Sequence, residues 1–261
     1  MLSKLLKRDL YKNMHWLWIL FVATIGVAGI TRGCKELGES IAFFRIMGIF
    51  FDSVFYALAV NVVLQPFLRN FLNFKVSFYS DESYLTHTLP VTKNQLLNSK
   101  YLTAIIEIVS GFACLVASIL IMYATPNKGL MLQMLLSTIV SGNVSVWLVV
   151  SLFVVLIIVE FLMFISIIYF GIVMGFKSRD HKVLKSFIYT AICAMASIAV
   201  LAVVLVIVFV ICGIELTTST LMLSSSALFA VVISAIVIYL GISTLFYFLT
   251  RREFNKGVNV D

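Results

Sequence analysis

The chain has 261 residues, of which 62% are hydrophobic and only 12% are charged, and its mean hydropathy is +1.09. A soluble fold of this length cannot bury so much apolar surface, so the composition predicts a polytopic membrane protein. The net charge of +7 does not indicate a nucleic-acid-binding protein, because in a membrane protein the position of each cation matters more than the sum.

Residues 1–13 alternate leucine with basic residues at helical spacing. The apolar stripe and basic face predict an amphipathic helix that lies on an anionic membrane surface. A first transmembrane helix is expected at about residues 15–31. No signal-peptide cleavage site follows it, so we expect this helix to remain in the mature protein.

Five further apolar runs are long enough to cross the hydrocarbon core, which needs about 20 residues. They lie at about residues 41–67, 100–124, 144–176, 187–214 and 224–249. A shorter run at 130–140 predicts an interfacial or re-entrant helix. The expected fold is therefore all-α, with six transmembrane helices in a single membrane domain that covers residues 1–261.

The positions of the basic residues predict the orientation. If both termini are cytoplasmic, all but four of the 19 Lys and Arg residues lie inside. The four exceptions are Arg32, Lys35, Arg45 and Lys128. This agreement with the positive-inside rule predicts cytoplasmic termini, and it also places residues 68–99 in the cytoplasm.

Several polar side chains lie within the predicted membrane helices, where a charge is costly and indicates a role. Candidates for a translocation path are Arg45, Asp52, Asn61 and Glu160. The alternative is that these groups, and Glu107 with them, make hydrogen bonds between buried helices, with the carboxyls partly protonated.

Two Gly-x-x-x-Gly patterns, at Gly29–Gly33 and Gly171–Gly175, permit close helix packing. The catalytic patterns GxxxxGK[ST], HExxH and GxSxG do not occur in the sequence. Four scattered cysteines and three isolated histidines give no metal-ligand spacing. We therefore predict that the chain is not an enzyme and that it binds neither a metal ion nor ATP itself.

Residues 79–95 form the one long polar passage of the chain. Ser80 is a suitable N-cap for a short helix that opens with Asp81 and Glu82, and Pro90 would end that helix. The sequence Thr92–Gln95 has the form of a capping box, which predicts a helix that continues into the third transmembrane helix. The alternative is an ordinary solvated loop.

This passage resembles a known segment. Asp81–Lys93 reads DESYLTHTLPVTK and Gln95–Lys100 reads QLLNSK. Both are similar to the cytoplasmic "LPVS/T…SK" segment between the second and third membrane helices in permease subunits of ABC-2 type exporters. Six helices, cytoplasmic ends and a basic amphipathic N-terminus match the family layout over the whole chain. The stretch 213–223 is short for the outer helices that the family usually has there.

The resemblance implies a permease of a bacterial plasma membrane that exports a hydrophobic or amphipathic peptide, lipid or drug. Antimicrobial-peptide export or resistance is a common role in the family. A second permease protomer, as a homo- or heterodimer, and two copies of an ABC-type ATPase would complete the transporter, with ATP and Mg²⁺ on the ATPase. The coupling segment that docks on the ATPase would include Asp81, Glu82, Tyr84, Leu85, His87, Leu89 and Pro90.

Two other functions fit the sequence. Asp52 and Glu160 leave open an ion- or proton-coupled secondary transporter, although the inverted repeats typical of many such carriers are not detectable. A non-transporting membrane protein, such as an assembly factor or an integral enzyme, is the third hypothesis.

Overall fold

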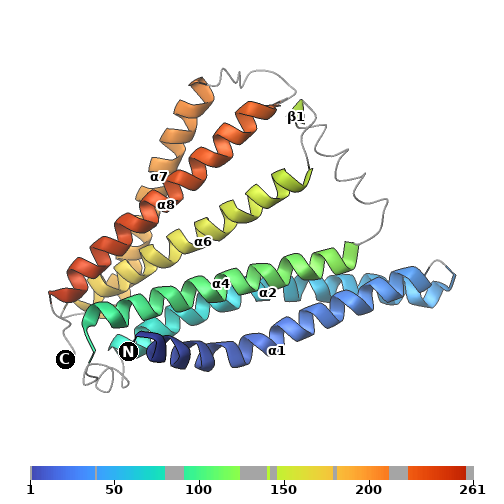
Figure 1. Ribbon diagram of the computed structural model, residues 1–261, viewed down its shortest axis with the longest axis horizontal. Coiled ribbons are helices and arrows are strands. Elements are labelled where there is room, and N and C mark those ends of the chain that lie inside the picture. Colours follow the sequence, from blue (N-terminus) through green and yellow to red (C-terminus); the bar gives the residue numbers. More distant parts are fainter. Residues whose placement is uncertain are drawn as a thin grey trace. The chain divides into compact units, whose positions relative to one another are not determined.

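The computed structural model describes residues 2–38, 40–79, 91–123, 140–141, 146–178, 181–211 and 223–256. The chain divides into two compact units, Met1–Thr125 and Pro126–Asp261. Each unit contains three long helices (Figure 1). Among the described residues, six helices are long and apolar enough to cross a membrane. The prediction of an all-α, multi-pass membrane protein with six transmembrane helices is confirmed.

The first unit consists of α1 (Leu2–Leu37), α2 (Ala42–Tyr79) and α4 (Lys93–Tyr123). Each of these helices packs against the other two. Leu17 and Phe21 of α1 meet Val62 of α2 and Cys114 of α4 in a buried apolar cluster. A second cluster, further along the same helices, consists of Ala28, Phe55 and Met122.

Helix α1 joins two elements that the sequence predicted separately. The amphipathic segment 1–13 and the first transmembrane helix at 15–31 form one continuous helix, which bends near its start (Figure 1). No glycine or proline occurs before Gly26 to break it. The basic residues of the first turns are exposed, as expected, but a stripe at a spacing of four is buried within the unit. Its members are Leu5, Asp9, Asn13 and Leu17.

Helix α2 extends to Tyr79, well beyond the predicted end of the second membrane helix at residue 67. Pro66 lies inside the helix and has no N–H to donate to the carbonyl of Val62. Gly111 of α4 lies against that carbonyl, so closely that a Cβ there would be 3.0 Å from the oxygen. Phe74 and Phe78 beyond the proline are completely buried. Tertiary packing therefore holds the helix together past the proline.

Helix α4 begins as the sequence predicted. The backbone N–H of Gln95 donates to Thr92 Oγ1 at 3.4 Å, and the N–H of Thr92 donates to Gln95 Oε1 at 3.3 Å. This reciprocal pair is a capping box, which satisfies backbone donors that the helix itself leaves free. The helix start that the capping box at Thr92–Gln95 predicted is confirmed.

The second unit consists of α6 (Val146–Phe176), α7 (Lys182–Ile211) and α8 (Ser225–Asn255). A two-residue parallel pair joins β1 (Val140–Ser141) to β2 (Leu223–Ser224). The predicted helix at 130–140 otherwise lies outside the described residues. The main apolar cluster comes from α6 and α8, with Val159, Met163, Ile167, Tyr239 and Phe246.

Small residues set the contact between α6 and α7. A Cβ at Gly171 would overlap the side chain of Thr190, and a Cβ at Gly175 would overlap the backbone of Ser186. A small-x-x-x-small pattern on each helix therefore lets the two backbones approach closely. In contrast, a Cβ at Gly29 or Gly33 would meet nothing within 4 Å. Of the two predicted packing patterns, the described contacts use only Gly171–Gly175.

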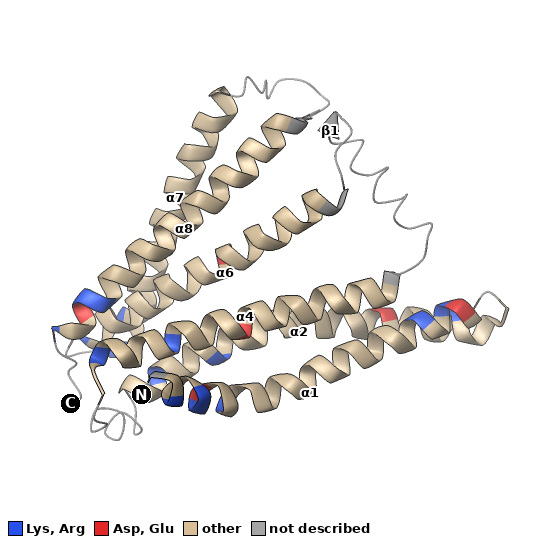
Figure 2. Cartoon of the chain, in the orientation of Figure 1, with Lys and Arg blue, Asp and Glu red and all other residues tan. Residues whose placement is uncertain are grey.

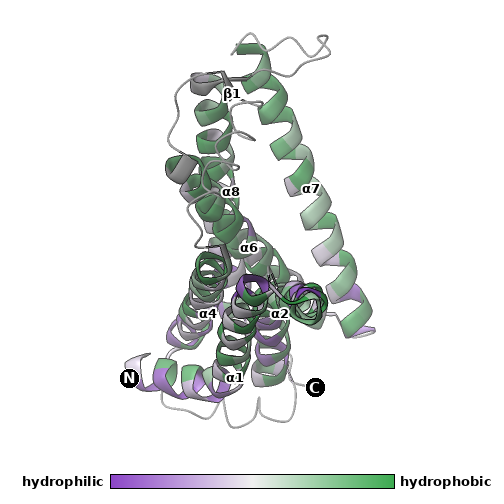
Figure 3. Ribbon diagram, turned by 90° about the vertical axis from the view of Figure 1, so that its right-hand side faces the viewer, coloured by the Kyte–Doolittle hydropathy of each residue, from purple (hydrophilic) through white to green (hydrophobic). Residues whose placement is uncertain are grey.

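Most charged residues lie toward the helix ends of each unit, whereas Glu107 of α4 and Glu160 of α6 lie in the helix interiors. In the first unit, they gather at the N-terminal end of α1 and at the opposite end, where α1 meets α2 (Figure 2). In the second unit, Lys177 after α6 pairs with Glu253 near the end of α8, with 2.6 Å between Nζ and Oε2. Hydrophobic residues dominate the middle of α7 and α8 (Figure 3). Each unit thus has the polarity expected of membrane-spanning helices.

Candidate functional site

A buried polar network lies inside the first unit, close to the ends of the helices that flank the polar passage. We define it as Asp9 and Asn13 of α1, Asn70 and Asn73 of α2, and Ser99, Lys100 and Glu107 of α4. On each helix the members are one or two turns apart and so lie on the same helix face, except that Ser99 and Lys100 are adjacent. All are buried except Asn73, which is half-buried.

An ion pair connects the start of α4 to α1. Lys100 Nζ lies 3.0 Å from Asp9 Oδ2, and both side chains are about nine-tenths buried. Ser99 Oγ donates a hydrogen bond of 3.2 Å to the same carboxylate oxygen. Arg8 Nη2 lies 3.6 Å from Asp9 Oδ1. Asp9 is therefore held by two residues from the second turn of α4, directly after the capping box.

Amide side chains continue the network toward α2. Asn73 Nδ2 donates to Asn13 Oδ1 at 2.7 Å. Asn70 Nδ2 donates to Glu107 Oε2 at 2.8 Å and also to the carbonyl of Pro66 at 2.8 Å. Glu107 is completely buried, and its Oε1 accepts no hydrogen bond from the described residues. The network thus connects all three helices through polar contacts, which are strong where water is excluded.

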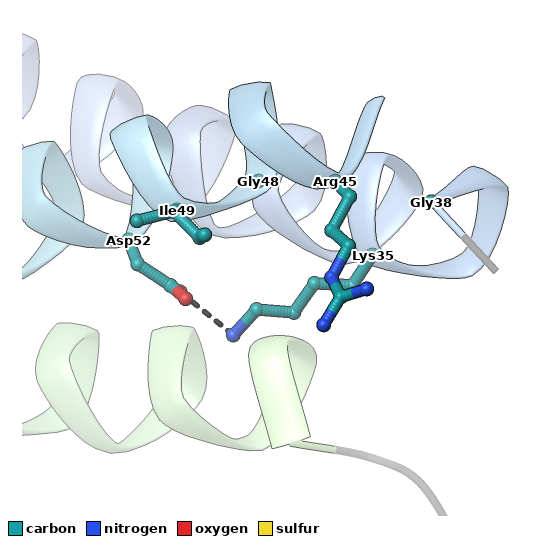
Figure 4. A pocket seen from close by; sticks show the side chains of 6 residues that line it. All are labelled: Lys35, Gly38, Arg45, Gly48, Ile49 and Asp52. Atoms are coloured by element: carbon teal, nitrogen blue, oxygen red, sulfur yellow. Dashed lines mark ion pairs between the residues drawn. The ribbon is translucent and has the colours of Figure 1, made fainter. Parts of the chain in front are cut away.

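A pocket of ≈ 410 Å³ lies at the opposite end of the same unit. We call it the Arg45 pocket; its lining residues are Lys35, Gly38, Arg45, Gly48, Ile49 and Asp52. Asp52 Oδ1 and Lys35 Nζ are 2.7 Å apart, and the Arg45 side chain points into the same space (Figure 4). The two basic groups and one carboxylate leave an excess of positive charge among these lining residues.

The structure brings together only part of the predicted translocation path. Arg45 and Asp52 line one pocket, as their shared helix face suggested. Asn61 is exposed, and its Nδ2 donates to the carbonyl of Ala57 in its own helix. Glu160 is half-buried on α6 in the other unit, near the phenol of Tyr239. The predicted docking residues, from Asp81 to Pro90, lie outside the described residues.

Sequence reasoning missed two partners. Lys35 pairs with Asp52, whereas the sequence offered only Arg45 on the same helix. Asp9 was not singled out, although it is the one acidic residue among the basic residues of the first turns. Its position four residues after Leu5 and eight before Leu17 placed it on the buried face. This spacing from the buried leucines could have predicted that Asp9 is buried.

Comparison with family models, curated proteins and solved structures gave no match. Among the described residues, no group of three His, Cys, Asp or Glu side chains lies close enough to hold a metal ion. The described residues form two polar features between helices of the first unit. One is the buried polar network at one end, and the other is the positively charged Arg45 pocket at the opposite end.

Proposed function

We propose that the chain is the membrane permease subunit of an ATP-driven exporter of the ABC-2 type, with ATP hydrolysed by a separate ATPase subunit. The observation that carries this proposal is the position of the buried ion pair. Ser99 and Lys100 lie in the second turn of α4, at the end of the stretch that resembles the coupling segment, and both contact Asp9 of α1.

This arrangement supports a mechanical role for the segment. Breaking a buried ion pair costs about 3 kcal/mol or more, because it leaves an unpaired charge without water. A displacement of the start of α4 by an ATPase would therefore move α1 with it. Asn70 and Glu107 extend the connection to α2, so the three helices would respond together.

The chemistry of the membrane helices supports a class of cargo for this proposal. Their surfaces carry many exposed aromatic and aliphatic side chains, which suit a hydrophobic or amphipathic substrate such as a peptide, lipid or drug. In this proposal, two permease protomers and two ATPase subunits work together in a bacterial plasma membrane. Antimicrobial-peptide export or resistance is the role we favour.

Reconstitution with an ABC-type ATPase tests the proposal, and we expect the gene of that ATPase to lie beside the gene of this chain. We expect the two proteins to co-purify and the wild-type chain to stimulate ATP hydrolysis. A variant with the sequence of Asp81–Pro90 scrambled should lose both properties while still folding, as judged by its helical circular dichroism. Equal recovery of the ATPase with both proteins would contradict the proposal.

The second candidate is an ion- or proton-coupled carrier. Glu107 favours it in one respect, because a completely buried carboxylate, with one oxygen that accepts no hydrogen bond from the described part of the chain, is a suitable proton acceptor. Such a carrier needs no ATPase. Uptake or efflux driven by a pH gradient in vesicles that contain only the purified chain would support the carrier and exclude the exporter. ATP dependence would exclude the carrier.

A further inference from the structure

The Arg45 pocket is formed by a close approach of α2 to the end of α1. The N–H of Gly38 donates to the carbonyl of Cys34, and a Cβ at Gly38 would lie 3.1 Å from both the backbone N and the Cα of Arg45. Any larger residue would push α2 away at this point. The pocket thus depends on the contact between these two backbones, and the Arg45 side chain points into it (Figure 4).

The charges of the pocket do not balance. Lys35 is paired with Asp52 at 2.7 Å. Arg32, further back on α1, is paired with Glu36 at 2.9 Å outside the pocket. Arg45 forms no ion pair with any of the described residues, which do not include Glu39. A guanidinium beside an already neutralised pair attracts an anion, and its planar fork matches two oxygens of a phosphate.

The surroundings of the pocket are apolar. Ile46 and Phe50 lie between pocket residues along α2 and are largely exposed, as is Ile49 in the pocket wall. In a membrane protein, such side chains contact acyl chains. A ligand that satisfies both features has an anionic head for Arg45 and an apolar body for the α2 surface.

We propose that the Arg45 pocket binds the phosphate group of an anionic phospholipid, with Arg45 as the main contact and Lys35, shared with Asp52, as the second. The same groups could bind a soluble phosphate ester, so the experiment distinguishes a phospholipid from a soluble ligand. With the topology that the basic residues predict, the pocket lies near the outer surface. The proposal does not depend on whether an ATPase drives the chain.

Native mass spectrometry of the delipidated, detergent-solubilised full chain provides the test. The probes are phosphatidylglycerol, phosphatidylcholine and, as competitors, glycerol phosphate and inorganic phosphate. We expect phosphatidylglycerol to bind more tightly than phosphatidylcholine. Arg45→Gln should weaken phosphatidylglycerol binding by about tenfold, since it removes a charge-assisted bidentate contact. Arg45→Lys keeps the charge but loses the planar guanidinium, so it should lower the affinity for phosphatidylglycerol less than Arg45→Gln does.

Arg32→Gln is the matched control, because it removes a basic group at the same end of the unit without altering the pocket. Its affinity for phosphatidylglycerol should stay within about twofold of the wild type. Binding of phosphate or glycerol phosphate without binding of phosphatidylglycerol would overturn the lipid proposal in favour of a soluble phosphate ligand. Three other results would overturn the proposal. No phosphate probe binds, Arg45→Gln binds phosphatidylglycerol as tightly as the wild type, or Arg32→Gln loses as much affinity as Arg45→Gln.

Discussion

Asp9 and Lys100 form the most buried ion pair of the described residues, with about one-tenth of each side chain exposed. Removing two charges from water is costly, and their attraction compensates only when the geometry is good and further hydrogen bonds are made. Ser99 supplies such a hydrogen bond to Asp9. The loss of one partner should therefore be more harmful than the loss of both.

We predict that Lys100→Met lowers the free energy of unfolding by about 3 kcal/mol, because Asp9 would remain buried without its cation. The double variant with Asp9→Leu should be less destabilised than Lys100→Met alone. Equilibrium unfolding in mixed detergent micelles, followed by circular dichroism, measures both.

The exposed pair of Arg32 and Glu36 gives the control for this prediction. Its side chains are 40% and 60% exposed, so Arg32→Met leaves Glu36 hydrated and should cost less than about 1 kcal/mol. If Lys100→Met were no more harmful than Arg32→Met, the buried pair would not be the rigid connection that our proposed mechanism requires.

At the scale of elements, close packing of α6 and α7 depends on two glycines in one helix and two small hydroxyl residues in the other. Ser186 and Thr190 lie opposite Gly175 and Gly171. Without a hydrophobic driving force between helices in lipid, such close contact is a main source of association. Gly29 and Gly33 have the same spacing but no neighbour within 4 Å, so the pattern alone does not identify an interface.

We predict that Gly175→Ala destabilises the second unit by about 2 kcal/mol, because its methyl group would overlap the backbone of Ser186 and force α7 to move. Gly33→Ala is the matched control. It adds the same methyl group in open space and, because alanine favours helix, should stabilise by up to about 1 kcal/mol. The same unfolding assay measures both variants. Equal stability of the two would show that the close approach of α6 and α7 contributes nothing.

At the scale of the whole molecule, the distribution of basic residues predicts which helix ends face the cytoplasm. The first turns of α1 and the last turn of α8 are both rich in basic residues, whereas the adjoining ends of α1 and α2 carry both signs. The positive-inside rule then predicts that both termini lie inside and that the Arg45 pocket lies outside.

Single-cysteine variants in a background without the native cysteines test this topology. Glu36→Cys should react with a membrane-impermeant maleimide in intact cells. Ser3→Cys and Lys256→Cys should react only after permeabilisation. All three positions lie at helix ends and are exposed, so accessibility depends on the side of the membrane. Labelling of Ser3→Cys in intact cells would show that the predicted orientation is wrong. The Arg45 pocket would then lie on the cytoplasmic side.

Local features of the sequence sufficed to predict the six helices and the start of α4. A run of about 20 apolar residues is stable in lipid only as a helix, and the capping box involves residues three positions apart. Both depend on neighbours along the chain. The coupling segment from Asp81 to Pro90 stays a prediction of the same local kind, based on its resemblance.

Tertiary structure decided what depends on the rotation and depth of one helix relative to another. It paired Asp52 with Lys35 of another helix and buried Asp9 against Lys100. It also kept α2 helical through Pro66 and used one of the two glycine patterns for close packing. Helix periodicity defines which residues share a face, but not which face meets a neighbour. That choice comes from the combined packing of three helices, in which small residues and buried polar pairs favour one arrangement over the others.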